Sequence, residues 1–237
     1  MKHVDIRRLS LFIISLVSSQ TGCIPGDKTP ATSTATATST ATATCTLAPG
    51  PSPTMIGSTC LDRADFGDPG MSAYVLPYPV GESHPLDQSY CTFGRSHADQ
   101  LAYDFGMDLG DDVTAARSGQ VVEANESFSD DDANSSHFNY VFIQHEDGTA
   151  AFYAHLMQNS LLVEVGDAVE AGQVIARVGH SGMPTNYRSV LHFGVYASWP
   201  ALDGNDVAVN FRNTEGAFDL RNGLATGGDY QALPWIP

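Results

Sequence analysis

The stretch Asn139-Tyr-Val-Phe-Ile-Gln-His-Glu-Asp-Gly-Thr-Ala-Ala-Phe-Tyr-Ala-His155 decides the fold. It contains two runs rich in apolar and aromatic residues, Asn139–His145 and Thr149–His155, on either side of Glu146-Asp-Gly148. An Asp-Gly pair between two such runs is a strong signal of a tight turn between antiparallel strands. We therefore predict a β-hairpin in the middle of the chain.

Further strands are predicted on both sides of this hairpin. Asp104-Phe-Gly-Met-Asp-Leu109 alternates along its length, so Asp104 should lie on one face of a sheet and Phe105 and Leu109 on the other. The remaining strand-like segments are Gln120–Ala124, a strand pair within Val163–Gly179, Val190–Tyr196, Val207–Arg212 and Ala217–Leu220. No stretch has the pattern of a long amphipathic helix. The predicted fold class is mostly β, built on an antiparallel β-sheet.

Composition narrows the classes of function. The chain has 237 residues, 42% of them apolar, which is enough for a substantial core. Its formal net charge is −16. Because binding to phosphate backbones needs a basic surface, we expect no nucleic-acid partner.

The N-terminus has the pattern of an export signal. Residues 1–22 combine basic residues with the short apolar run Leu9–Val17, and this run is shorter than the roughly 20 residues that cross a bilayer. The run leads into Ser19-Gln-Thr-Gly-Cys23, which resembles the site at which bacterial lipoproteins are cleaved and lipidated, although Gln20 departs from the usual aliphatic residue. Two interpretations stay open, a lipid on Cys23 and plain secretion, and both predict an exported protein.

Residues 23–59 are predicted to be a linker, and residues 60–237 the folded domain. The linker is rich in Thr, Ala and Pro, a composition that cannot bury enough apolar surface to fold. Cys60 and Cys91 flank the start of the domain, so we favour a disulfide between them. Cys45 is then left as a free thiol or an intermolecular bridge. The chain has no Cys-x-x-Cys pair, which makes a cysteine-type zinc site an unfavoured interpretation.

Three side chains form a candidate metal site. His97 and Asp104 are seven residues apart, and His192 lies within the predicted strand Val190–Tyr196. Imidazole and carboxylate groups are zinc ligands, and three protein ligands with one open position are typical of a catalytic zinc site. The spacing is weak evidence by itself, because a His and an Asp fall seven residues apart often by chance.

Taken in order, the motifs between Tyr74 and Trp199 resemble peptidase family M23, the lysostaphin-type or LytM domain. The matching segments are His97, Asp104-Phe105, Gly110-Asp-Asp-Val-Thr-Ala115, Tyr153-Ala-His-Leu156, Val165-Gly-Asp-Ala-Val-Glu-Ala-Gly-Gln173 and Leu191-His-Phe193. The resemblance implies an antiparallel sheet or sandwich with a groove that holds one Zn²⁺. It also implies that His97, Asp104 and His192 are the zinc ligands and that His155 is catalytic. Residues after Trp199 are expected to be a β-extension that wraps the domain or edges the groove.

The function implied by the resemblance is zinc-dependent hydrolysis of peptide bonds in bacterial peptidoglycan, in the stem or the cross-bridge. We expect a monomer whose partner is a peptidoglycan peptide. Its predicted location is either a bacterial membrane, reached through a lipid on Cys23 and facing the periplasm or cell surface, or the medium after secretion.

One residue departs from the family pattern. The family motif His-Leu-His is Val190-Leu-His192 in this chain, so Val190 replaces a histidine on the metal-facing side of the strand. General-base catalysis typically contributes about 10²–10⁴-fold. The alternative function is therefore a zinc-retaining pseudoenzyme that binds peptidoglycan or regulates another cell-wall hydrolase. Four other histidines have no assigned role and are expected at the surface: His84, His137, His145 and His180.

Overall fold

The computed structural model describes residues 59–202 and 204–236. The predicted signal peptide 1–22, the linker 23–59 apart from Thr59, and the cysteines Cys23 and Cys45 therefore lie outside the described residues. No helix in the described ranges has the length and apolar character needed to cross a membrane. The helical segments there are one turn each, α1 (Cys60–Arg63) and η1 (Pro69–Met71).

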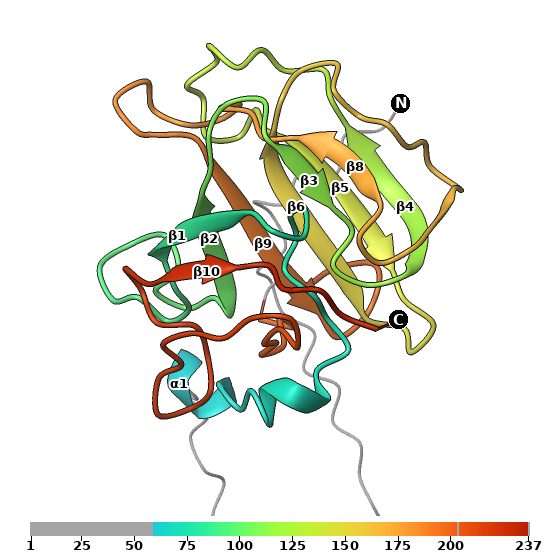
Figure 1. Cartoon of the computed structure of the whole chain (residues 1–237). Helices are drawn as coiled ribbons and strands as arrows, with labels where there is room; N and C mark the ends of the chain where they lie inside the picture. The colour runs from blue at the N-terminus through green and yellow to red at the C-terminus, as the bar shows by residue number, and fades with distance from the viewer. Residues whose placement is uncertain (1–58, 203, 237) are drawn as a thin grey trace, which may run out of the picture. The chain divides into compact units, whose positions relative to one another are not determined.

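The described residues form an eight-stranded antiparallel sheet and a two-stranded one (Figure 1). The large sheet has the order β10-β1-β2-β9-β6-β5-β4-β7, and the small sheet pairs β3 with β8. The strands are β1 (Ser83–Gln88), β2 (Ala102–Gly106), β3 (Asp112–Thr114), β4 (Gly119–Asn125), β5 (Asn139–Gln144), β6 (Ala150–Leu156), β7 (Ala168–Val169), β8 (Val174–Arg177), β9 (Val190–Tyr196) and β10 (Asp229–Gln231). The prediction of a mostly β, antiparallel fold is confirmed.

One face of the large sheet forms the core. Successive residues of a strand point to opposite faces, so β9 sends Leu191, Phe193 and Val195 inward, and all three are at most 1% exposed. The small sheet covers part of this face and adds its own apolar residues to the same cluster, including Val113 and Ile175. The opposite face carries the polar side chains discussed below.

The central hairpin is confirmed. Strands β5 and β6 pair with Tyr153 opposite Val141, and the backbone N–H of His145 donates to the carbonyl of Thr149 over 2.8 Å. Gly148 has a φ of 87°, a left-handed conformation that glycine adopts without steric cost. The Asp-Gly signal in the sequence therefore located the turn because it supplied the residue that this backbone needs.

Other expectations about strands were wrong in their pairing or extent. The segment Val163–Gly179 contains β7 and β8, but β7 pairs with β4 and β8 with β3. The strand containing Asp104 ends at Gly106, and Leu109 is 57% exposed in the turn that follows. These short strands depend on partners distant in the sequence, which local alternation does not identify.

The C-terminal extension is less regular than predicted. Val207–Arg212 and Ala217–Leu220 form no strands and hold only isolated bridges at their margins, Tyr196 with Asp206 and Phe218 with Leu224. Its only strand within the described residues is β10, which pairs with β1 at the edge of the large sheet. The extension nevertheless wraps the domain, because Phe211 is fully buried in the core.

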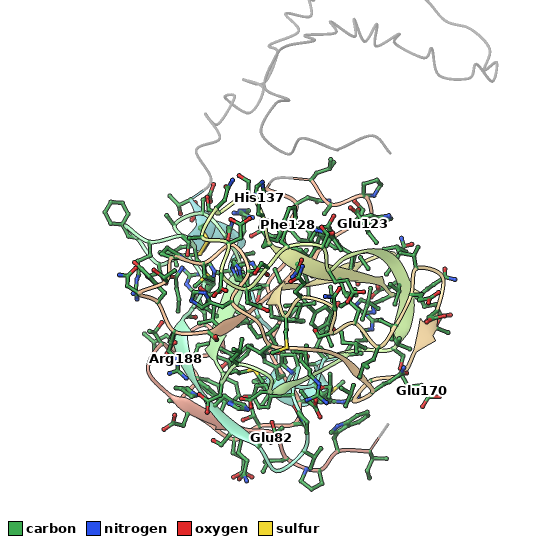
Figure 2. The ribbon with its side chains drawn as sticks, turned by 90° about the horizontal axis from the view of Figure 1, so that it is seen from above. Glu82, Glu123, Phe128, His137, Glu170 and Arg188 are labelled. Atoms are coloured by element: carbon green, nitrogen blue, oxygen red, sulfur yellow. A yellow bond between two sulfur atoms is a disulfide. The ribbon has the colours of Figure 1, made fainter. Side chains whose placement is uncertain are left out.

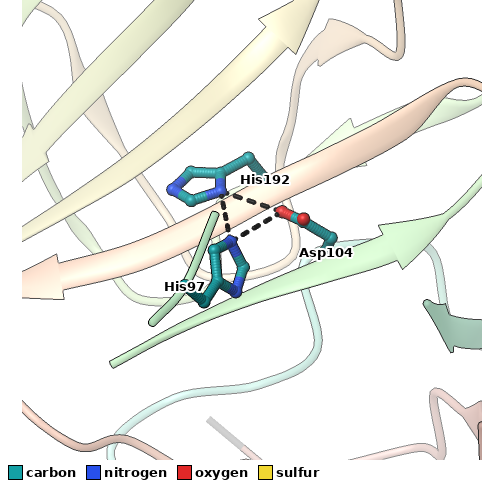
Figure 3. Close-up of side chains that lie close together, drawn as sticks. All are labelled: His97, Asp104 and His192. Atoms are coloured by element: carbon teal, nitrogen blue, oxygen red, sulfur yellow. Dashed lines mark hydrogen bonds and ion pairs between the residues drawn. The ribbon is translucent and has the colours of Figure 1, made fainter. Parts of the chain in front are cut away.

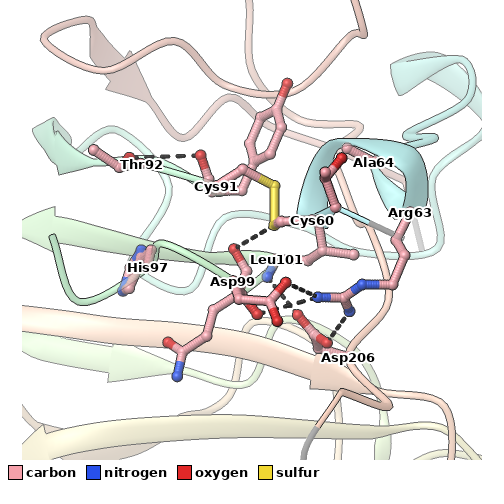
Figure 4. The surroundings of a disulfide bond; sticks show 12 residues. Cys60, Arg63, Ala64, Cys91, Thr92, His97, Asp99, Leu101 and Asp206 are labelled. Atoms are coloured by element: carbon pink, nitrogen blue, oxygen red, sulfur yellow. Dashed lines mark hydrogen bonds and ion pairs between the residues drawn. A yellow bond between two sulfur atoms is a disulfide. The ribbon is translucent and has the colours of Figure 1, made fainter. Parts of the chain in front are cut away.

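The predicted disulfide between Cys60 and Cys91 is present (Figure 4). It closes a separation of 31 residues and attaches α1 to the loop that follows β1. That loop is also held by a backbone hydrogen bond from Cys91 to Gln100 and by ion pairs of Arg63 with Asp99 and Asp206. The loop carries His97, so these links determine where that side chain lies.

Replacing both Cys60 and Cys91 by Ser should lower the free energy of unfolding by about 3–4 kcal/mol, because the cross-link no longer restricts the unfolded chain. Urea unfolding with and without Zn²⁺ measures both this loss and the expected weaker zinc binding through a looser His97 loop. Cys45→Ser is the matched control and should leave both unchanged. Equal stability of the double variant and the parent would contradict the prediction.

Candidate metal centre

Asp104 and His192 lie directly opposite one another in the middle of the large sheet. Their strands, β2 and β9, are neighbours, and the register pairs Asp104 with His192. Opposed residues of an antiparallel pair point to the same face with their Cβ atoms about 4.5–5.5 Å apart. The Oδ1 atom of Asp104 lies 2.8 Å from Nδ1 of His192 (Figure 3).

His97 reaches the same point from the loop before β2. Its Nε2 atom lies 3.1 Å from Nδ1 of His192 and 3.2 Å from Oδ1 of Asp104, and the residue is only 1% exposed. Its other ring nitrogen, Nδ1, faces the carbonyl oxygen of Ser89 at 3.2 Å. Since a carbonyl can only accept, Nδ1 carries a proton, which leaves Nε2 as the ring nitrogen that would bind a metal ion at the cluster.

The donor set and its spacing fit a zinc ion. A tetrahedral zinc with bonds of about 2.0–2.1 Å holds its ligand atoms about 3.3 Å apart. The three atoms here are 2.8, 3.1 and 3.2 Å from one another. The structure thus brings together His97, Asp104 and His192, which the sequence analysis singled out from two distant places in the chain. Three protein ligands leave one position for water or substrate, as in catalytic sites.

The electrostatics of Asp104 favour a bound cation. Burial acts to raise the pKa of Asp104, but hydrogen bonds from His192 and His97 outweigh it and hold the pKa below its ordinary value. The carboxylate is therefore charged at neutral pH, although it is only about one-sixth exposed (16%). Such a buried negative charge is stabilised by a positive partner, which an ion between the three ligand atoms would supply.

His155 is turned toward this cluster by a β-bulge. In the β5–β6 ladder, Asn139 pairs with Leu156 and Tyr140 with Ala154, so His155 is an extra residue with no partner. It has a φ of 63°, which is uncommon for a residue other than glycine. In a regular strand the neighbour of Ala154 would face the core. Here the imidazole instead lies with its ring centre 6.2 Å from that of His192.

The hydrogen bonds of His155 leave one ring nitrogen available. Nδ1 donates to the carbonyl oxygen of Ser181 over 2.8 Å, and Nε2 has no hydrogen-bond partner among the described residues. Burial lowers the pKa of His155 to about 4, with the nearby His192 acting in the same direction. The ring is therefore neutral at pH 7 and carries a lone pair on Nε2. That is the state in which an imidazole can accept a proton.

The resemblance described above leads us to expect a histidine at the position of Val190. Val190 lies two residues before His192 on β9 and opposite Gly106 on β2, and it is 6% exposed. Its side chain offers no proton acceptor. The two ring nitrogens of His180 face carbonyl oxygens, Nδ1 that of Asp130 at 3.4 Å and Nε2 that of Tyr187 at 2.9 Å. These contacts hold His180 between its own loop and the loop that connects β4 to β5.

The expectation of a surface position was wrong for His145, which is 4% exposed. Its Nδ1 donates to the carbonyl oxygen of Ser118, and its ring packs edge-on against Tyr74 at 5.5 Å between centres. Burial lowers the pKa of His145 to about 4, so the ring is neutral at pH 7 and fits the interior. Its place at the hairpin turn concealed this, because a turn residue is usually solvated.

Two residues beside the cluster were not anticipated. Asp87 on β1 and Arg188 in the loop before β9 form an ion pair that lies over Gly106. Neither belongs to a motif, and the strand β1 was not predicted, so no signal in the sequence placed them there. The groove implied by the resemblance also stays a prediction, because the surface hollows around Asp65 and Ala73 do not include the cluster.

Comparison with known proteins identifies the class of the domain. Residues 99–210 match the family model of peptidase family M23, a range that contains Asp104, His155 and His192 and begins just after His97. The resemblance to peptidase family M23 seen in the sequence is thereby confirmed over these residues.

Individual relatives match parts of the chain. The chain is 34% identical over 103 residues to outer membrane antigenic lipoprotein B of Histophilus somni. This match covers 44% of the present chain and 27% of the lipoprotein. The catalytic domain of lysostaphin from Staphylococcus simulans is 28% identical, with a TM-score of 0.38 over 53% of this chain and 86% of its own. The prophage-encoded M23 protein EnpA from Enterococcus faecalis is 23% identical, with a TM-score of 0.43 over 55% of this chain and 93% of that chain.

We expect the full chain to bind about one zinc ion, and His97→Ala or His192→Ala to abolish this binding by removing one of three converging ligands. Metal analysis after dialysis against trace zinc gives the stoichiometry. His180→Ala is a control, since both ring nitrogens face backbone carbonyls, those of Asp130 and Tyr187, and its loss should leave the zinc in place. Full zinc occupancy in both ligand variants would refute the assignment.

The left-handed backbone conformation of His155 leads to a separate prediction about the stability of variants at this position. His155→Gly should be more stable than His155→Ala by about 1 kcal/mol, because only glycine adopts this φ without strain. Denaturant unfolding measures the difference, and both variants should retain zinc. At the neighbouring Ala154, in regular strand, Ala154→Gly should instead be destabilising. An alanine at position 155 as stable as glycine would show that the bulge carries no strain.

Proposed function

We propose that this protein is an exported zinc metallopeptidase that hydrolyses peptide bonds in bacterial peptidoglycan. The observation that carries the proposal is the convergence of Nε2 of His97, Oδ1 of Asp104 and Nδ1 of His192 within a domain of peptidase family M23. The relative named an outer membrane lipoprotein supports the export part of the proposal, together with the signal-like residues 1–22. We further propose that Cys23 carries the lipid and that the chain acts as a monomer.

The residues divide the chemical work among them. A zinc ion held by His97, Asp104 and His192 would supply a Lewis acid that polarises the scissile carbonyl and makes water more acidic. The carbonyl of Ser89 keeps His97 in the tautomer that presents Nε2 to the ion. His155 has Nε2 free to take the proton from the attacking water. The carbonyl of Ser181 fixes the orientation of the ring.

The surroundings of Val190 favour a second candidate function. The residue is buried beside the cluster and cannot accept a proton, and it stands where the family pattern leads us to expect a histidine. A chain that keeps the ligands and loses turnover would bind peptidoglycan or regulate another cell-wall hydrolase. His155 favours the peptidase, because its free Nε2 and neutral charge meet the need for an acceptor.

Digestion of purified peptidoglycan separates these functions. The zinc-loaded full chain should release new amino termini, and His155→Ala should lower the rate by about 10²–10⁴-fold while retaining zinc, since it removes the proton acceptor. Val190→His should accelerate release if the added imidazole shares this task. Release by Val190→His alone would establish the pseudoenzyme, and no release by any zinc-loaded form would reject the peptidase.

A further inference from the structure

The guanidinium group of Arg188 lies against the backbone of the strand that carries Asp104. A Cβ atom built on Gly106 would be 2.6 Å from Cζ and 2.7 Å from Nη1 of Arg188, closer than side chains approach one another. The glycine at position 106 is therefore what gives the guanidinium its space. Gly106 follows Asp104 by two residues on β2, so both positions face the same side of the sheet.

Asp87 holds this guanidinium from the neighbouring strand β1. Its Oδ2 atom lies 3.4 Å from Nε of Arg188 and would be 2.6 Å from the same Cβ on Gly106. The ion-pair contact between the two side chains is made by Nε. Neither terminal nitrogen of Arg188 has an acceptor among the described residues, and about half of the side chain (49%) is exposed. The two terminal nitrogens thus form a free fork of the kind that binds a carboxylate through two parallel hydrogen bonds. Arg188 is labelled in Figure 2, on the side of the molecule opposite Glu170.

The negative charges around Arg188 indicate what kind of ligand its positive charge could bind. Burial raises the pKa of Asp87, and the negative charge of Asp104 adds to this effect, whereas Arg188 and Arg95 oppose it. Arg188 therefore sits in the field of two carboxylates at the metal cluster, on a chain with a formal net charge of −16. An acidic peptide approaching such a surface is repelled unless a local cation receives its carboxylate.

The spacing sets which carboxylate could reach Arg188. Two residues along a strand span roughly 6.6 Å, which is the separation of positions 104 and 106. An extended peptide advances about 3.3–3.6 Å per residue. A peptide whose scissile bond lies at the metal cluster would thus present to Arg188 a group one or two residues away from that bond.

From this geometry we propose that Arg188 is a specificity residue that binds a substrate carboxylate one or two residues from the scissile bond. Asp87 positions its guanidinium, and the absence of a side chain at Gly106 leaves space for it. The proposal rests on the proposed function, since it assumes a peptide at the metal cluster. Arg188 binds charge and does not transfer protons. Its loss should weaken the binding of acidic peptides and leave the chemical step of neutral ones unchanged.

The test compares a synthetic peptidoglycan stem peptide that has free carboxylates with the same peptide in which they are amidated. Binding is measured calorimetrically on the metal-free full chain, and kcat and KM on the zinc-loaded one. Arg188→Gln should weaken binding of the free-acid peptide about tenfold, mainly through KM, as expected for the loss of a charge-assisted pair. The amidated peptide should bind equally to both forms.

Three further variants make the result specific. Gly106→Ala keeps the arginine but displaces its guanidinium, so it should reproduce the loss seen with Arg188→Gln. Asp87→Asn removes the carboxylate that positions the guanidinium but keeps the fork itself, so it should reduce the preference for the free acid by less than Arg188→Gln does. Arg177→Gln is the matched control: Arg177 on β8 has the same exposed fraction, 49%, in an ion pair with Asp112, and its loss should change neither peptide.

The outcomes separate this proposal from the proposed function. Cleavage of both peptides with equal KM, unaffected by Arg188→Gln, would overturn the subsite and leave the peptidase in place. Loss of binding to both peptides alike in Arg188→Gln would also overturn it, since it would indicate a structural role. Preference for the free acid without any cleavage would support the subsite and reject the peptidase. Thermal unfolding of each variant verifies that it is folded.

Discussion

The register of β2 against β9 is the constraint on which the rest of the structure depends. It places Asp104 opposite His192 on one face of the sheet and Phe105 opposite Leu191 on the other. A slip of one residue would exchange the two faces, and would bury the polar pair while exposing the aromatic core. Burial of Tyr103, Phe105 and Phe193, each 0% exposed, thus opposes any other register. The energy that forms the core is also what brings two of the three candidate ligands together.

The sheet alone does not complete the site. The positions of the His97 and His155 side chains depend on local features of the loop and strand that carry them. His97 lies in a loop, where a side chain would be mobile unless it were held. The disulfide at Cys91 and the ion pairs of Arg63 hold it from both ends. His155 lies on a strand whose regular alternation would send it into the core, and the bulge turns it back. Rigid placement by the surrounding structure keeps such groups near productive geometry without a cost at the moment of reaction.

Much of this arrangement could be predicted from the sequence where the signal was local. The Asp-Gly turn and the apolar runs located β5 and β6, and the motif around His192 located β9 to the residue. The strands β1, β3 and β10 were not predicted, since β3 and β10 are three residues long and all three pair with segments remote in the sequence. The ligand trio was found through a family likeness rather than through spacing. The Asp87–Arg188 pair was not found, because it depends on a glycine whose importance is visible only when its neighbours are placed.

Val190 and Gly106 face one another across β9 and β2, and neither has a side chain that could accept a proton at this edge of the cluster. The absence of a side chain at Gly106 leaves room for the Arg188 guanidinium, but a guanidinium stays protonated and cannot take the place of an imidazole as a base. Among the described acceptors next to the cluster that are not ligands themselves, Asp87 is paired with Arg188. His155 is the acceptor with an unpaired nitrogen. Our two proposals therefore assign proton transfer and charge recognition to different sides of the candidate metal centre, His155 on β6 and Arg188 over β2.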